Sequence, residues 1–307
     1  KGHEKIQVLG VRKIFFSDKK IILNAIKIKN LALSKNLKIN IVKELSEKKG
    51  ISPKTILNQA RINSKEVKKN DIFFAIKGKK NDGNKFVGEA IKKKASVVIV
   101  SKINKKNNIK SQIKVKDTLE FLTQCSTIYR KNINTKIIAV TGSCGKTTLK
   151  ELLGSSFKKL SKVSTSPKSY NNKYGVPLSL FNINEKDEYG ILEVGMDKKG
   201  EIDYLSKIIK PDVSVITNIN YAHAKNFKNI KEIALAKSEI INNTKNNGFL
   251  ILNSDDNFFN LQKKIALKKN INIISFGIKN KNSNIKLLNI QKVRQKYKIT
   301  IKINNLK

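Results

Sequence analysis

Apolar runs and helical repeats alternate along most of the chain and predict an α/β protein. Short runs rich in β-branched and aromatic residues, typical of buried strands, are separated by segments whose apolar residues recur at helical spacing. Such alternation favours mainly parallel sheets with both faces covered, in which ligands bind at the carboxyl ends of the strands. The predicted strands are 72–76, 95–100, 137–140, 190–194, 213–217, 249–252 and 271–276, and the predicted helices are 41–48, 85–94, 118–129, 146–160, 202–209 and 230–241.

The same pattern divides the chain into successive parts. The first folded part is expected to be a small α/β domain, and the last a P-loop-type, mainly parallel sheet with helices on both faces. The polar stretch 103–114 between them is expected to be a loop. The expected parts are a separate N-terminal segment (1–30), the small domain (31–104), a linker and helix (105–135), and the larger domain (136–307), which is expected to be incomplete.

Lysine dominates the composition and raises the possibility of a nucleic-acid partner. The formal net charge is +41, with 64 lysine and arginine residues, and such a charge can attract polyanions. Only Arg12, Arg61, Arg130 and Arg294 are arginine, although arginine is the better bidentate ligand for phosphates and guanine. The lysines are spread among many asparagines and isoleucines, residues that share AT-rich codons. We therefore expect a solvated lysine surface and no specific nucleic-acid partner, with a non-catalytic basic nucleic-acid-binding protein as the alternative.

Other sequence features favour a cytoplasmic protein without a membrane span; we also expect a monomer. No run approaches the roughly 18 apolar residues that a spanning helix needs, and the N-terminal residues lack the apolar core of a signal peptide. Cys125 and Cys144 are too few for a disulfide framework. The sequence starts with Lys1 and its one methionine is Met196, so we expect the natural chain to begin upstream.

The strongest chemical signal is the octapeptide TGSCGKTT, residues 141–148, which follows a predicted strand and opens a predicted helix. Its glycines let backbone N–H groups converge on phosphate oxygens at the positive end of the helix. Lys146 can reach the β- and γ-phosphates of a nucleotide, and the Thr147 hydroxyl suits Mg²⁺. Full Walker spacing needs glycine where the chain has Val140. A chance glycine turn before a helix is therefore the competing interpretation.

Further segments follow the loop in an order that resembles a known family. They are SYNNKYGVPL (169–178), LEVGM (192–196) with GEI (200–202), TNI (217–219) with AH (222–223), AKSEI (236–240) and NSDD (253–256). Together with the loop, they resemble the Mur ligase superfamily, ATP-dependent amide ligases of bacterial cell-wall synthesis. The asparagine pair at 171–172 is similar to that of the MurF branch of this superfamily.

The resemblance implies roles for the matching residues. The loop would bind the nucleotide phosphates, while Asn172 would contact the γ-phosphate region and Asn253 the adenine. Taken alone, Glu193 also fits a solvated acid at a strand end, and His223 and Lys237 fit ordinary residues of their type. The implied nucleotide-binding loop residues are Gly142, Ser143, Cys144, Gly145, Lys146, Thr147 and Thr148; the implied catalytic set is Lys146, Glu193, His223 and Lys237; and the implied Mg²⁺ ligands are Thr147, Glu193, His223 and, once carbamylated, Lys237.

A second group of residues resembles the UDP-sugar-binding domain of the same branch. The residues expected to bind this substrate are Ser64, Lys65, Lys77 and Gly78. The family usually has Asp, Arg and His where this chain has Asn63, Lys65 and Asn84. Without the fork of an arginine, bidentate phosphate recognition is weaker. Turn chemistry alone would also explain these residues.

The first residues resemble a different branch. The sequences KGHE (1–4) and IFFSD (14–18) are similar to the C-terminal end of MurE, in which the glutamate matching Glu4 helps to hold an incoming diamino acid. We expect a fusion of two ligases, with a frameshift or a missing stop codon as the alternative. No activity is assigned to Glu4, because the rest of that domain is not in the sequence.

The implied reaction joins D-alanyl-D-alanine to UDP-N-acetylmuramoyl tripeptide through an acyl phosphate, with ATP and Mg²⁺. The alternative is another ligase of the superfamily: an amino-acid-adding MurE-like enzyme, a folylpolyglutamate synthetase or a cyanophycin synthetase. The C-terminal domain that binds the incoming amine in this family is expected to be missing from these 307 residues. The chain alone is therefore expected to bind ATP weakly without useful turnover.

Overall fold

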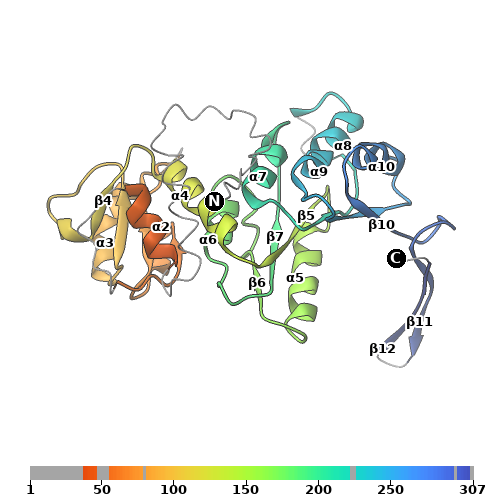
Figure 1. Cartoon of the computed structure of the whole chain (residues 1–307), viewed down its shortest axis with the longest axis horizontal. Helices are drawn as coiled ribbons and strands as arrows, with labels where there is room; N and C mark the ends of the chain where they lie inside the picture. The colour runs from red at the N-terminus through yellow and green to blue at the C-terminus, as the bar shows by residue number, and fades with distance from the viewer. Residues whose placement is uncertain (1–36, 47–54, 79–80, 222–225, 294–295, 305–307) are drawn as a thin grey trace, which may run out of the picture.

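The structure is a computed structural model that describes residues 37–46, 55–78, 81–221, 226–293 and 296–304 (Figure 1). The predicted N-terminal segment with Glu4, and the predicted site residue His223, lie outside these residues. The described parts form two parallel or mainly parallel sheets with helices against them, as the alternation of apolar runs predicts.

The first sheet has four parallel strands in the order β1-β2-β3-β4. One face, with Ile72 and Phe74, packs in the same core as α2, and the other face, with Phe73 and Val98, packs in the same core as α3. Both faces are thus covered, which explains why β2 and β3 are apolar throughout. The elements are α2 (Leu37–Ser46), β1 (Ala60–Arg61), β2 (Ile72–Phe74), α3 (Val87–Lys92), β3 (Val97–Val100) and β4 (Gln112–Lys114), with 3-10 turns at Ser64–Glu66, Gly83–Phe86 and Ile109–Ser111.

Strand β4 corrects the prediction that 103–114 is a loop throughout. It pairs in parallel with β3, so the first sheet continues beyond residue 104. Its sequence, QIK, has one apolar residue, too few for a recognisable alternation. The Gln112 side chain is buried and bonds the backbone of Asn104 and Asn108, which fastens the preceding turn to the sheet.

The second sheet has eight strands in the order β12-β11-β10-β9-β8-β5-β7-β6. All neighbouring strands are parallel except β11 and β12, which form an antiparallel hairpin. The hairpin extends away from the rest of the molecule in Figure 1. The strands are β5 (Lys136–Thr141), β6 (Val163–Thr165), β7 (Tyr189–Glu193), β8 (Val213–Ile216), β9 (Phe249–Asn253), β10 (Asn272–Gly277), β11 (Ile285–Val293) and β12 (Lys296–Ile303).

Helices cover both faces of this sheet, as predicted. Helix α5 packs on one face, against Ile138, Val140 and Val215. The other face belongs to a core that also contains residues of α4, α6, α7, α8 and α10. The helices are α4 (Thr118–Asn132), α5 (Lys146–Phe157), α6 (Gly175–Phe181), α7 (Glu201–Ile209), α8 (Ile230–Ser238), α9 (Ile240–Asn243) and α10 (Phe259–Leu267).

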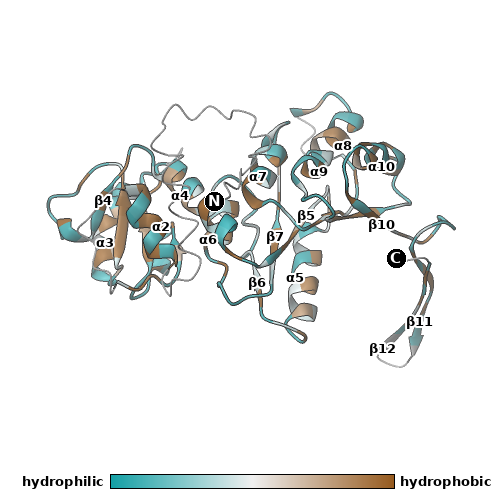
Figure 2. Cartoon of the chain, viewed as in Figure 1, coloured by the Kyte–Doolittle hydropathy of each residue, from teal (hydrophilic) through white to brown (hydrophobic). Residues whose placement is uncertain are grey.

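One apolar core joins the two sheets. Helix α4 lies between them in Figure 1, and the apolar residues follow the strands and the inner helix faces in Figure 2. The ring of Phe181, on α6, contacts Phe74 of the first sheet and Tyr129 of α4 edge-on, with centroids 6.4 and 5.4 Å away. No helix within the described ranges is long and apolar enough to cross a bilayer.

Candidate active site

The loop 141–148 connects β5 to α5, the strand–loop–helix arrangement that the sequence predicts. Gly142 has φ +146° and Gly145 has φ +80°, both in the region that favours glycine. A Cβ on Gly142 would lie 1.9 Å from Thr217 Oγ1. Both glycines therefore take a backbone conformation that a residue with a Cβ rarely adopts, and Gly142 also lacks room for a side chain.

Thr217 and Asn218, which follow β8, form hydrogen bonds with the backbone of this loop. The Asn218 side chain accepts a bond from Cys144 N (3.1 Å) and donates one to Cys144 O (3.2 Å). Thr217 Oγ1 donates to the same carbonyl at 2.6 Å, and Ser143 N donates to Asn218 O at 2.9 Å. The Asn218 side chain thus bonds both backbone polar groups of Cys144. This role is not apparent from the sequence, because Asn218 and Cys144 are 74 residues apart in the chain.

Lys146 is folded over the loop. Its Nζ donates to Gly142 O at 3.0 Å and is 3.4 Å from Ser143 O. Cys144, Gly145 and Thr148 are exposed around it. Its ammonium therefore lies against the loop backbone, and its contact with nucleotide phosphates stays a prediction.

Glu193, at the end of β7, is the buried acid of the site. It is 1% exposed, and it accepts bonds from Thr147 Oγ1 and Asn171 Nδ2, both at 2.7 Å. Thr147 and Glu193, predicted to act together, do lie together. Of the asparagine pair, Asn171 contacts Glu193, although Asn172 was the predicted site residue. The Asn172 side chain is exposed and accepts bonds from the N–H groups of Tyr174 and Gly175 at the start of α6.

Lys237 reaches the same loop from α8. It is 2% exposed, and its Nζ donates to Gly142 O at 2.9 Å. Burial, reinforced by the nearby charge of Lys146, lowers the pKa of Lys237 to about 8. The predicted pair of lysines therefore meets at one carbonyl oxygen.

The oxygens of Thr147 and Glu193 are of the kind that a hard cation prefers. Within the described ranges, no three His, Cys, Asp or Glu residues gather as a metal cluster. A hydroxyl and a carboxylate oxygen are a donor set that suits Mg²⁺.

A cavity of about 1160 Å³ opens in front of these residues. Lys146, Asn171 and Lys237 line it, together with the start of α7. Gly78, from the first sheet's domain, lines it too, which brings one predicted substrate residue to the phosphate loop. Asn172 is also in this wall, whereas Asn253 ends β9, two strands away from β5.

The other predicted substrate residues lie within the first domain. Ser64 is buried and its hydroxyl donates to Glu89 Oε2 at 2.6 Å. The side chains of Lys65 and Lys77 are exposed, and Asn63 caps the short turn that contains Ser64. Asn84 likewise bonds Asp82 and Ser101. Asn63 and Asn84 therefore make the local turn contacts that the turn-chemistry interpretation expects.

Comparison with known proteins agrees with this geometry. The family described as "Mur ligase middle domain" matches residues 140–307, and "Mur ligase family, catalytic domain" matches residues 58–137. The chain is 38% identical over 261 residues to the UDP-N-acetylmuramoyl-tripeptide–D-alanyl-D-alanine ligase of Rickettsia prowazekii (83% of this chain, 57% of the relative). It is 36% identical over 241 residues to the ligase of the same name from Buchnera aphidicola of Acyrthosiphon pisum (76% and 51%).

Solved structures give the same result. MurF from Acinetobacter baumannii superposes with a TM-score of 0.73 at 30% identity, over 85% of this chain and 57% of that one. MurF from Thermotoga maritima in complex with ADP gives 0.68 at 28% identity, over 83% and 56%. The chain spans about half the length of the curated relatives it matches. The predicted α/β fold and the resemblance to the MurF branch are confirmed, and the chain belongs to the Mur ligase family.

Proposed function

We propose that this chain carries the nucleotide-binding part of a MurF-type ligase, which uses ATP to join D-alanyl-D-alanine to UDP-N-acetylmuramoyl tripeptide. The observation that carries the proposal is the convergence of Lys146, Thr147, Glu193 and Lys237 on one phosphate loop beside a large cavity. The names of the relatives supply the two substrates, and the ADP complex of one of them supports the nucleotide. We place the reaction in the cytoplasm and expect a monomer.

In the first step, the tripeptide carboxylate attacks the γ-phosphorus of ATP, the bond to the β-phosphate oxygen breaks, and ADP leaves. Such a transfer depends on positioning and on neutralising charge. The N–H groups of the first turn of α5 and the Lys146 ammonium would bind the β- and γ-phosphates, whereas those of Ser143 and Cys144 are bonded to Asn218. The cavity would admit the carboxylate from the side that Gly78 lines. Asn172, in the same wall, is proposed to contact the γ-phosphate region, and Asn253 the adenine.

Thr147 and Glu193 would hold Mg²⁺, with His223 and a carbamylated Lys237 as further ligands. The ion would supply positive charge to the phosphate oxygens. Asn171 fixes one carboxylate oxygen of Glu193 and so sets how the other is presented. With a pKa of about 8, Lys237 has more free amine near neutral pH than an ordinary lysine, and the free amine is the form that reacts with carbon dioxide.

In the second step, the amine of the dipeptide attacks the acyl carbon of the acyl phosphate. A tetrahedral intermediate forms, the carbon–oxygen bond to phosphate breaks, and the amine loses its proton.

The UDP-sugar would bind to the first domain through Ser64, Lys65, Lys77 and Gly78. The lysine at position 65 can offer a point charge but not a fork. The affinity for the diphosphate is therefore proposed to be lower than it would be with arginine at this position.

Phosphate release from ATP tests this function, measured for the chain and for the full-length product of its gene. The assay contains UDP-N-acetylmuramoyl tripeptide with either D-alanyl-D-alanine or a single amino acid. Release from the full-length product that needs the dipeptide, and that is lost in Lys146→Ala, is expected. Release with a different acceptor would keep the family and change the substrate. No release from a folded full-length product with any acceptor would overturn the proposal.

A further inference from the structure

Lys150 is a fully buried lysine that the proposed reaction does not use. It lies one turn after Thr147 in α5 and is 0% exposed. Its ammonium has three N–H donors, and three oxygens surround it. They are Ser166 O at 2.7 Å, Lys168 O, and Glu151 Oε1 at 2.9 Å. A charge withdrawn from water is costly unless it is paired and hydrogen-bonded, and here two carbonyls accept hydrogen bonds from the ammonium and a carboxylate pairs with its charge.

The two carbonyls belong to the turn that follows β6. Ser166 N donates to Ile191 O at 2.9 Å, and Ser166 Oγ accepts a bond from Glu193 N at 3.2 Å. Lys168 has φ +48°, a left-handed conformation that costs energy for a residue with a Cβ. Lys150 thus holds a strained turn against the end of the strand that carries Glu193.

The turn leads directly to Asn171. Asn171 N donates to Ser169 O at 2.8 Å, and Gly195 N donates to Asn171 O at 2.8 Å. The side chain of Asn171 then bonds Glu193 Oε1. A Cβ on Gly195 would lie 2.9 Å from Asn171 Cγ, so the amide occupies a space with little freedom.

Helix α5 therefore reaches the Glu193 carboxylate by two routes. Thr147 donates to one oxygen directly, and Lys150 acts on the other through the turn and Asn171. Residues three apart share one helix face, which is why Thr147 reaches the end of β7 while Lys150 reaches the turn after β6. We propose that Lys150 is a positioning residue: by holding the 166–168 turn, it places Asn171 and thereby orients the Glu193 carboxylate.

Amide hydrogen exchange tests the positioning without any ligand. The variant is Lys150→Met, which keeps the length and removes the charge; the matched control is Lys158→Met, an exposed lysine at the end of the same helix. We expect the amides of Tyr170, Asn171 and Glu193 to exchange at least about tenfold faster in Lys150→Met, with β8 unchanged. Equal acceleration throughout the sheet, or none, would overturn the proposal. If Lys150→Met does not fold, Lys150→Gln replaces it with the same expectation.

The consequence for the site rests on the proposed function and is tested by coupling. The Mg²⁺ concentration for half-maximal ATP binding is measured for the wild type, Lys150→Met, Asn171→Ala and the double variant. Each single change should raise this concentration about tenfold, and the double variant should be no worse than either, because both act on the same carboxylate. Additive losses would overturn the proposal. A wild type that binds no ATP would refute the proposed function, while the exchange measurement would still decide the role of Lys150.

Discussion

Gly142 and Gly145 occupy the same loop but tolerate a side chain differently. A Cβ on Gly142 would meet Thr217 Oγ1 at 1.9 Å, whereas a Cβ on Gly145 would have no atom within 4 Å. Gly145→Ala should therefore cost only backbone strain, about 1–2 kcal/mol. Gly142→Ala should also displace Thr217. Its affinity for ATP, measured by calorimetric titration, should therefore be at least tenfold lower, as an order of magnitude, than that of Gly145→Ala.

The steric part of this prediction has its own control. Thr217→Ala removes the hydroxyl that meets the new Cβ, so the double variant Gly142→Ala, Thr217→Ala should regain part of the lost affinity. Equal losses in the two glycine variants would show instead that strain alone matters.

The buried amine of Lys237 makes a prediction for pH. Its pKa falls from 10.5 to about 8 on folding, so between these values the unfolded chain binds more protons and the folded protein gains stability as the pH rises. Below pH 8 the cost of the buried charge is fully present. Lys237→Met should therefore raise the free energy of unfolding by about 1–3 kcal/mol at pH 7, and by less at pH 10.

Urea unfolding at the two pH values measures this difference. Lys231→Met, an exposed lysine on the same helix, should change the stability little at either pH. A benefit of Lys237→Met that is as large at pH 10 as at pH 7 would contradict a proton-linked cause. In carbon dioxide-rich buffer, a wild type that regains stability at pH 7 would agree with carbamylation.

At the scale of elements, one face of α5 contacts both the site and the sheet. Thr147, Lys150 and Gly154 follow one another on this face, and a Cβ on Gly154 would lie 2.5 Å from Thr165 Cγ2 of β6. Alanine is the better helix former by about 1 kcal/mol, but overpacking costs about 1–3 kcal/mol. Gly154→Ala should therefore destabilise the protein in thermal unfolding, and adding Thr165→Ser, which removes that methyl group, should reverse the loss. If Gly154→Ala is instead more stable than the wild type, β6 shifts enough to make room for the new methyl group.

Elements with a local signal could be predicted. The runs at 137–140 and 213–217 and the loop between Thr141 and Thr148 correspond closely to β5, β8 and the phosphate loop. Helix α6 was missed for a physical reason. Every residue of GVPLSLF is buried, and a helix without a polar face has no periodic pattern to read. Strand β6 was missed because its three half-buried residues are too few to alternate.

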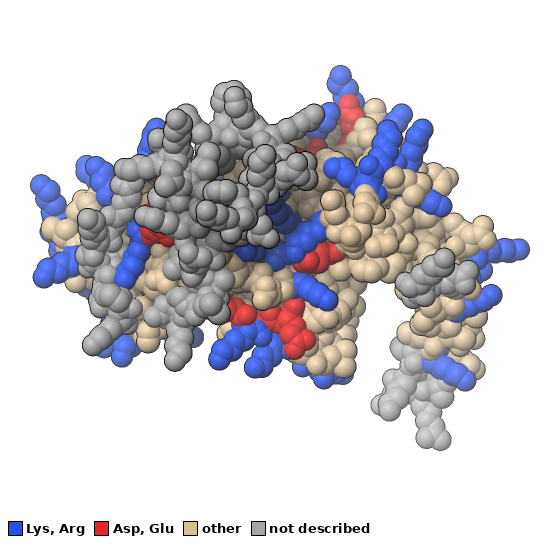
Figure 3. All heavy atoms as spheres, viewed as in Figure 1, with Lys and Arg blue, Asp and Glu red and all other residues tan. Residues whose placement is uncertain are grey.

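The candidate site was predictable where a motif carries the chemistry, as at Lys146, Thr147 and Glu193. It was not predictable where the partner is distant in the chain. Asn171, Asn218 and Lys150 act through residues far from them in sequence, and Lys150 is one of many lysines in the composition. Figure 3 shows lysine and arginine side chains spread over the visible surface. Only the fold distinguishes a buried lysine with three oxygen partners from a solvated one.

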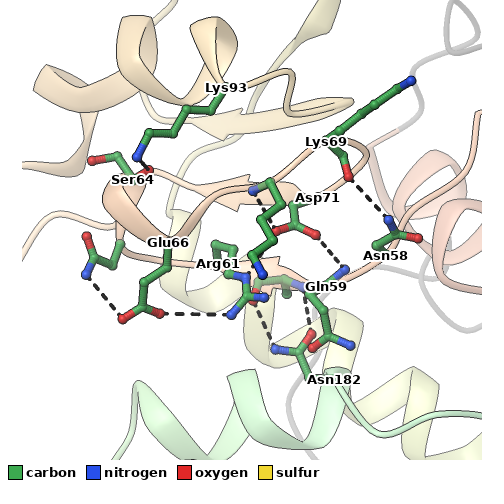
Figure 4. A network of polar contacts seen from close by, with 12 residues as sticks. Asn58, Gln59, Arg61, Ser64, Glu66, Lys69, Asp71, Lys93 and Asn182 are labelled. Carbon is green, nitrogen blue, oxygen red and sulfur yellow. Dashed lines mark hydrogen bonds and ion pairs between the residues drawn. The ribbon is translucent and has the colours of Figure 1, made fainter.

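At the scale of the whole molecule, a polar network fastens the two sheets to each other (Figure 4). Its hub is Asp71, which is 2% exposed and accepts bonds from Gln59 N, Arg61 Nε and Lys68 N at 3.0–3.1 Å. The network orders β1, the edge strand of the first sheet. Asn182, just after α6 of the second domain, then pairs with Ala60 of that edge: Ala60 N donates to Oδ1 at 2.6 Å, and Nδ2 donates to Ala60 O at 2.9 Å.

This joint, together with the shared apolar core, should make the two sheets unfold as one unit. Calorimetry should give a single transition, and the slowest amides of β3 and β5 should open with the same free energy.

Asn182→Ala leaves one N–H and one C=O of β1 without their partner, so it should cost about 1–3 kcal/mol. That loss should be equal in β3 and β5, because a continuous core transmits it to both. Asn184→Ala, which removes only a local turn bond to Lys186 N, is the matched control and should change neither strand. If protection falls in β3 alone, the first sheet opens by itself and the two domains are separate folding units.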